Sequence, residues 1–484
     1  MPISDTLTLD APAAAAPAPA ADRRRWWILA TMTGALSMIM IDQTVVSVAL
    51  PTIQHDLGLS VSGGQWVVNA YLLVLAVLVA LGGRVADLLG AERTFRVGTA
   101  LFVAASALCG LAGSGAEIVA ARGLQGLGAA MLVPSTGALI IDAFDVRERG
   151  KAMGVYSGVS MIFLALGPLV GGLLTQDVSW RAVFYVNLPI GLLMLAVAHA
   201  TLPRRPRPRI ARDAIDWLGI PLLIGALGSL TLALMQSQAW GWGSPAIVAL
   251  LAAAALLGPL FVWHERRAAA PLVQLRLFSL PNFAPDALIL AGVQFALVGA
   301  SVFGAAWSQH VLGFSAIHAG VAMLPLTIPL LITAPLAGRL YDRVGVKPLL
   351  VIGAALISLG LVWLAAHLHE RDYDVLIAGY ALMGAGIGLV MSPGTTDALG
   401  AASQGQRSQA SGIVQTVRQS GGVVGVAILG TIVAHLSAVA PDATPAARVD
   451  AATDAVSAAY WTGAAAMAAM ALLGLLWLGR RTAE

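Results

Sequence analysis

Apolar stretches of about twenty residues recur along the chain and are separated by short polar segments. Fourteen of them can be drawn, at residues 26–50, 66–84, 95–115, 117–141, 151–174, 182–202, 215–236, 245–264, 285–309, 318–340, 348–368, 373–396, 411–436 and 458–479. As a helix, with a rise of about 1.5 Å per residue, each stretch can cross roughly 30 Å of hydrocarbon. The pattern predicts an all-α integral membrane protein with 14 transmembrane helices.

A short motif repeats across the chain and suggests how the helices are grouped. Gly83-Arg84-Val85-Ala86-Asp87-Leu88-Leu89-Gly90 follows the second stretch, and Gly338-Arg339-Leu340-Tyr341-Asp342-Arg343-Val344-Gly345 follows the tenth. The copies occupy equivalent places if residues 203–282 are an inserted helix pair with cytoplasmic linkers. Residues 26–202 and 283–484 are then two six-helix halves, and residues 1–25 are a disordered cytoplasmic tail. Repeated halves that rock around a central site favour transport.

Composition and charge placement support this topology. The chain is 58% hydrophobic and 11% charged, which excludes an ordinary soluble protein and makes nucleic acid an implausible partner. Of its 28 Lys and Arg residues, 23 lie in the N-terminal tail, the even-numbered loops and the C-terminus, and three in the opposite loops. This asymmetry predicts that both termini are cytoplasmic. No loop has room for a catalytic domain, so we do not expect an enzyme.

Two ionisable residues lie deep inside predicted spans. Asp42 and Arg122 lie at matching depths in the first and fourth helices, so they can pair directly or through water. Ionisable groups inside a membrane are costly and are functional candidates by default. Asp42 can carry a coupling proton, form a static ion pair with Arg122, or bind a cation directly.

Other residues are candidates for a conformational switch, because they are charged groups in cytoplasmic loops or small residues and proline where helices pack closely. They are Gly83, Asp87, Arg93, Gly167, Pro168, Gly171, Asp342 and Arg418. Asp87 can instead cap a turn, and the glycine-proline segment can be a simple packing seam. Arg418 can meet the Asp87 loop, meet a substrate, or extend towards the cytoplasm. Asp286, at a helix start, is either structural or a second proton site.

Polar and aromatic residues within otherwise aliphatic spans are candidates to line a substrate cavity formed by helices one, two, four, five, nine, ten, twelve and thirteen. These are Asn69, Tyr71, Gln125, Tyr156, Phe163, Gln294, Phe295, Met391 and Gln415. Each of them can instead face lipid. Scattered histidines such as His367 and His369 have no further ligands nearby, so no metal site is predicted.

Several of these segments together resemble the fourteen-helix drug:proton antiporter branch of the major facilitator superfamily, over residues 26 to 480. The matching segments are Asp42 to Pro51, Gly83 to Arg93, Arg122 to Gly128, Gly167 to Gly172, Trp180 to Gly191, and Ala410 to Gln419. The chain departs from the family pattern at Leu88, Ala91 and Glu92, where basic residues are usual, and at Phe163, where glycine is usual.

The resemblance implies export of hydrophobic, aromatic or cationic small molecules such as drugs or antibiotics, in exchange for protons. No cofactor is expected besides the proton, and the partners are the small-molecule substrate and membrane lipids. Arg outnumbers Lys by 26 to 2, which is typical of GC-rich bacterial genomes, so we expect a protein of the bacterial cytoplasmic membrane. We also expect it to be a monomer. A dedicated exporter of one endogenous metabolite or antibiotic, and a proton-driven importer, are the alternatives.

Overall fold

The structure is a computed structural model that describes residues 19–203, 216–438 and 444–479. Within these ranges every regular element is a helix. Fourteen helical segments there are long and apolar enough to cross a membrane, which confirms the predicted fold class.

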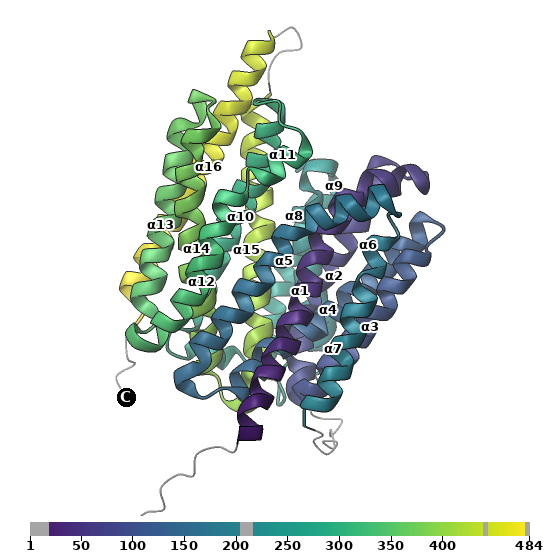
Figure 1. Cartoon of the computed structure of the whole chain (residues 1–484), viewed down its shortest axis with the longest axis vertical. Coiled ribbons are helices and arrows are strands. Elements are labelled where there is room, and N and C mark those ends of the chain that lie inside the picture. The colour runs from purple at the N-terminus through teal and green to yellow at the C-terminus, as the bar shows by residue number, and fades with distance from the viewer. Residues whose placement is uncertain (1–18, 204–215, 439–443, 480–484) are drawn as a thin grey trace, which may run out of the picture.

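The first six spans form one bundle, which lies on the right in Figure 1. Its helices are α1 (Pro19–Asp56), α2 (Val61–Leu89), α3 (Ala91–Leu111), α4 (Gly115–Ala143), α5 (Arg149–Asp177), α6 (Ala182–Tyr185) and α7 (Asn187–Thr201). Serine side chains define two of the starts: Ser60 accepts a hydrogen bond from the Gly63 amide, and Ser114 accepts one from the Glu117 amide.

The last six spans form the second bundle, on the left in Figure 1. Its helices are α10 (Phe283–His310), α11 (Ala316–Val321), α12 (Leu324–Val344), α13 (Val346–His367), α14 (Tyr373–Ala401), α15 (Arg407–Leu436) and α16 (Pro445–Trp477). Each copy of the repeated motif ends at a glycine with positive φ, Gly90 at 96° and Gly345 at 77°, which turns the chain into the next helix.

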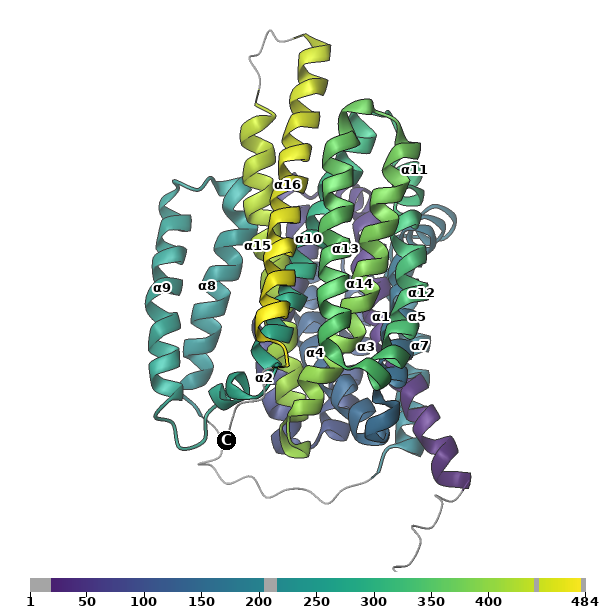
Figure 2. The ribbon, with the colours of Figure 1, turned by 90° about the vertical axis from the view of Figure 1, so that its left-hand side faces the viewer.

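The two added helices, α8 (Gly219–Trp240) and α9 (Pro245–Glu265), stand beside the bundles (Figure 2). Helix α8 packs against α2 of the first bundle and α15 of the second, while α9 packs against α8. A connector containing the short helix η3 (Leu275–Ser279) then leads into α10. The added pair therefore lies along one seam between the bundles.

Four boundaries differ from the sequence expectation. Helix α1 begins at Pro19, so Arg23 to Arg25 are helical and not part of a disordered tail; residues 1–18 lie outside the described part of the chain. Helix α16 begins at Pro445 and not near residue 458, because Thr444 caps an extra polar extension there. The sixth and tenth spans are each split into a short and a long helix. Hydropathy does not detect such breaks within an apolar run.

The two bundles meet closely at the end of the molecule where the described chain begins (Figure 1). A Cβ atom on Gly83 of α2 would lie 2.4 Å from the Ser408 carbonyl oxygen of α15. A Cβ atom on Gly338 of α12 would lie 2.1 Å from the Gly150 carbonyl oxygen of α5. The same position of the repeat therefore makes the same kind of backbone approach in each half, and only glycine fits there.

Candidate functional site

Asp42 and Arg122 form an ion pair inside the first bundle. Both side chains are fully buried, and Nη1 of Arg122 lies 2.6 Å from Oδ2 of Asp42. The Nε atom of Arg122 donates to the Val67 carbonyl oxygen of α2 at 2.9 Å. The predicted contact between the first and fourth spans is thus direct, without a bridging water.

The second carboxylate oxygen of Asp42 also accepts hydrogen bonds. Its Oδ1 accepts hydrogen bonds from the side-chain amides of Gln125 and Asn187, both at 2.8 Å. Ser106 of α3 accepts from the same two amides, at 2.8 and 3.4 Å. Helices α1, α3, α4 and α7 therefore converge on one carboxylate, whose charge is compensated by one guanidinium and two amide donors.

Two residues expected at the cavity wall belong to this Asp42 network instead. Gln125 donates to Asp42 and accepts from Arg122 at 2.6 Å. The ring of Tyr71 lies under the Arg122 guanidinium, 4.3 Å from its carbon atom, in a cation–π contact. Both side chains are completely buried. The expectation that they face the substrate cavity is corrected, because a buried charge pair recruits the nearest polar groups.

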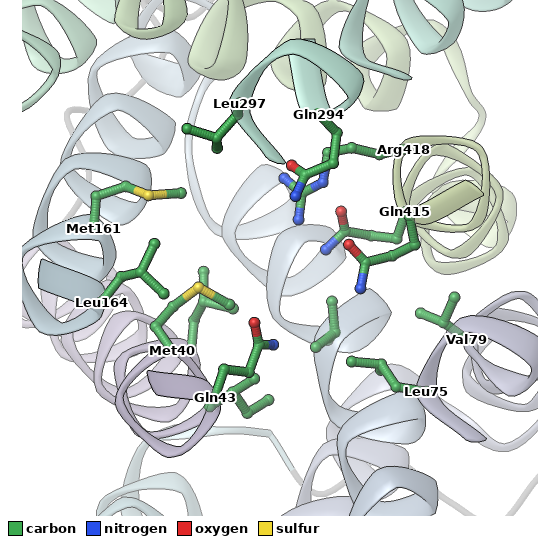
Figure 3. Close-up of a pocket in the computed structure, with 14 residues that line it drawn as sticks. Met40, Gln43, Leu75, Val79, Met161, Leu164, Gln294, Leu297, Gln415 and Arg418 are labelled. Atoms are coloured by element: carbon green, nitrogen blue, oxygen red, sulfur yellow. The ribbon is translucent and has the colours of Figure 1, made fainter. Parts of the chain in front are cut away.

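The cavity itself lies between the two bundles and consists of two narrow, adjoining hollows. They share the wall residues Leu36, Met40, Val133, Met161, Gln415 and Arg418. Figure 3 shows the polar side chains of Gln43, Gln294, Gln415 and Arg418 directed into the space between the helices. This combination of an apolar wall and a few convergent polar groups is typical of sites for small organic molecules.

Four of the predicted cavity residues line these hollows: Gln294, Tyr156, Met391 and Gln415. Asn69, Phe163 and Phe295 do not line either hollow. Phe163 packs instead on a hydrophobic cluster of the first bundle. The tenth span, expected to contribute, supplies no lining residue in the described part, because Pro335 of α12 packs against Gly154 and Gly158 of α5.

Sequence reasoning missed several important residues. Gln43, Met40 and Met161 line the cavity, Asn187 donates to Asp42, and Ser106 accepts from the Asn187 amide. Asn187 stands at the start of α7, just after the break in the sixth span. The signal in the sequence is a lone polar side chain, followed two residues later by Pro189, inside an apolar run.

Arg418, expected among the switch residues, lies at the cavity wall in both hollows. It does not meet the Asp87 loop, because Asp87 binds elsewhere. The Asp87 carboxylate accepts hydrogen bonds from the backbone amides of Ser408 and Gln409, at 3.1 and 3.0 Å. Asp87 thus caps the first turn of α15, a helix of the other half.

The second copy of the motif makes the reciprocal contact. Asp342 of α12 accepts a hydrogen bond from the Gly150 amide, at 3.2 Å, in the first turn of α5. Arg407 of α15 also pairs with Asp142 of α4, across the same interface. We call the Asp87 and Asp342 contacts the reciprocal caps. Arg93, another of the predicted switch residues, lies in the first turn of α3.

The glycine-proline segment forms a seam within the first half and not between the halves. A Cβ atom on Gly167 would lie 1.6 Å from Oγ1 of Thr44, and one on Gly171 would lie 3.1 Å from the Val45 backbone. Pro168 lies within α5, which continues to Asp177. The seam presses α5 against the part of α1 that directly follows Asp42.

The second half contains a buried acid of a different kind. Asp286, in the first turn of α10, is fully buried, and within the described part of the chain no cationic or amide group donates to its carboxyl oxygens. Its charged neighbour is Asp397 of α14, which accepts hydrogen bonds from Asn282 and Tyr341 at 3.1 and 2.9 Å.

Comparison with known proteins agrees with this architecture. The Major Facilitator Superfamily model matches residues 32–426 and 287–484. The chain is 35% identical to the multidrug resistance protein Stp of Mycobacterium tuberculosis, covering 86% of this chain and 78% of that protein. It is 36% identical to the tetracenomycin C resistance and export protein of Streptomyces glaucescens, covering 89% and 80%.

A solved transporter structure has the same fold. The proton:xylose symporter XylE, a major facilitator superfamily protein, superimposes with a TM-score of 0.66 at 16% identity, covering 94% of this chain and 99% of that one. At this identity the likeness concerns the fold alone. The family model and the sequence relatives together show that the chain belongs to the major facilitator superfamily and is a membrane transporter related to its drug and antibiotic exporters.

Proposed function

We propose that the protein is a proton-coupled antiporter that exports hydrophobic, aromatic or cationic small molecules by alternating access. It works as a monomer in the bacterial cytoplasmic membrane, with both termini inside and no cofactor besides the proton. The asymmetry of 23 basic residues against three supports this orientation. The export and resistance functions named for the relatives support the direction of transport.

The Asp42 network is the observation that carries the proposal. A fully buried carboxylate has its charge compensated by Arg122 and by the amides of Gln125 and Asn187. Protonation would remove that charge and weaken three charge-assisted contacts at once. The next residue, Gln43, lines the cavity. Helix α1 therefore connects the protonation state of Asp42 to the shape of the cavity.

The reciprocal caps are contacts that can be formed in one conformation of the transporter and broken in another. In the observed state Asp87 caps α15 and Asp342 caps α5, so the end of the molecule near the N-terminus is closed. With cytoplasmic termini, this is the inner end. Opening towards the cytoplasm breaks both caps, because each joins one half to the other.

Proton flux in proteoliposomes under an imposed pH gradient tests the proposal. Wild-type protein and Asp42→Asn are compared with a panel of cationic, neutral and anionic aromatic compounds. We expect substrate-triggered collapse of the gradient in the wild type and none with Asp42→Asn. Equal collapse with both proteins would mean that Asp42 is a static pairing residue. Movement of substrate and protons in the same direction would instead indicate an importer.

A dedicated exporter is the second candidate. One relative is named for the export of a single compound, tetracenomycin C. A narrow response, in which one scaffold in the panel drives proton flux and the others do not, would favour this second candidate over a multidrug pump.

A further inference from the structure

Arg418 brings an unpaired positive charge to the central cavity. Its guanidinium points into the space beside Gln294 and Gln415 (Figure 3). Its Nε atom is buried without a hydrogen-bond partner. Among the described residues, its electrostatic partner is the phenol of Tyr156 and not an acid.

No acidic side chain compensates this charge at the cavity wall. The described residues that line the two hollows include amides, hydroxyls, methionines and aliphatic side chains, but neither Asp nor Glu. Asp42 directly precedes the cavity residue Gln43, but Arg122 already pairs with its carboxylate. The cavity therefore presents one net positive charge in surroundings of low dielectric constant, where an uncompensated charge is costly and an anionic partner offsets that cost.

The remainder of the wall suits an aromatic body. Four methionines, Met40, Met153, Met161 and Met391, line the two hollows. Thioethers are adaptable and make favourable contacts with ring edges. Amide groups such as Gln294 and Gln415 can bind neutral oxygen substituents.

We propose that the cavity binds amphipathic aromatic anions, with Arg418 pairing a carboxylate or phenolate oxygen of the substrate. This inference rests on the proposed export function and narrows its substrate class to acids, in place of the cations that the family resemblance suggests. Exchange of a monoanion for one proton moves two charges across the membrane, whereas exchange of a monocation moves none. Transport of the preferred substrate is therefore electrogenic.

Binding to the full-length protein in nanodiscs tests this inference without requiring transport. The probes are anthracene-2-carboxylate, anthracene-2-carboxamide and 2-(aminomethyl)anthracene, which share one ring system and differ in charge. The proteins are wild type, Arg418→Gln, Arg418→Lys and Arg339→Gln, an exposed arginine on α12 that serves as the matched control. Thermal unfolding of each variant checks that it is folded.

We expect the wild type and Arg339→Gln to bind the carboxylate at least tenfold more tightly than the amide, and the amine most weakly. Arg418→Gln should bind the carboxylate no better than the amide, with amide binding unchanged within twofold, and Arg418→Lys should restore part of the preference. Tighter binding of the amine, absence of saturable carboxylate binding, or a preference that survives Arg418→Gln would each overturn the inference.

A flux measurement separates this inference from the proposed function. Wild-type proteoliposomes receive each probe under a pH gradient, with and without a potassium–valinomycin potential. Carboxylate binding without any proton movement would contradict antiport while leaving the binding site intact. Proton flux driven by the amine alone would support antiport and overturn the anionic substrate class. If the protein is an antiporter and its substrate is an anion, proton flux driven by the carboxylate should depend on the membrane potential.

Discussion

Among the described residues, each half of the transporter buries one aspartate completely, but the two carboxyl groups have opposite surroundings. Asp42 pairs with Arg122 and accepts hydrogen bonds from Gln125 and Asn187. Asp286 has no cationic or amide partner there, and its neighbour is another acid, Asp397. Both lie on helices that line the cavity, so burial and position do not separate them; the compensated charge is what singles out Asp42 as the proposed coupling residue.

Removal of the Arg122 side chain should cause the largest loss of stability. Arg122→Leu leaves the Asp42 carboxylate buried without a counter-charge, and we expect a loss of about 3–5 kcal/mol in stability. Thermal unfolding in detergent measures this loss. The double variant Asp42→Asn/Arg122→Leu removes both charges and should recover most of the stability. No recovery would show that Arg122 acts mainly through packing against Tyr71.

Asn187 offers a milder change to the same network. Asn187→Leu keeps a similar volume but removes one donor to Asp42, and a hydrogen bond to a charged group contributes about 1.5–3 kcal/mol. We therefore expect Asn187→Leu to lower thermal stability by an amount in this range and to weaken substrate-triggered proton flux. Wild-type stability and flux in this variant would show that the donor from Asn187 contributes nothing to the Asp42 network. Asn69→Leu, on α2 and outside the network, is the control.

The reciprocal caps allow the two halves to be compared directly. Asp87→Ala and Asp342→Ala should each favour opening of the closed end, by about 0.5–2 kcal/mol, the usual range for loss of a helix cap. Spin-label distances between α2 and α15, and between α5 and α12, would measure the opening. Asp87→Ala should have the larger effect, because Asp87 accepts two of these backbone hydrogen bonds and Asp342 accepts one. Asp56→Ala, at the far end of α1, should leave these distances unchanged.

Replacement of Asp286 should change the stability of the protein least, and should raise it where the other substitutions lower it. Asp286→Asn places an amide donor beside Asp397 and removes an acid that has no cationic partner, so we expect unchanged or slightly higher stability, by up to about 1 kcal/mol. Thermal unfolding measures it against Asp42→Asn, which should be destabilising. A marked loss of stability in Asp286→Asn would mean that its carboxyl group has a structural role beyond the contacts described.

The sequence predicted the parts of this structure that depend on composition and depth. Apolar length and basic asymmetry predicted the fourteen spans, and counting residues inward predicted the Asp42–Arg122 pair. Which face of an evenly apolar helix meets the cavity could not be predicted, because α4 and α10 carry no polar stripe that distinguishes the faces. For this reason Gln125 and Phe295 were placed at the cavity wall, while Gln43 was missed.

The added helix pair makes the two seams between the halves unequal towards the surrounding lipid. Helix α8 packs on both α2 and α15, so it covers one seam (Figure 2), whereas α5 and α12 meet on the opposite side. A relative movement of the halves must slide α2 or α15 along α8, while the α5–α12 seam moves without that partner. For a hydrophobic molecule dissolved in the bilayer, the transporter thus has a shielded flank and an open one.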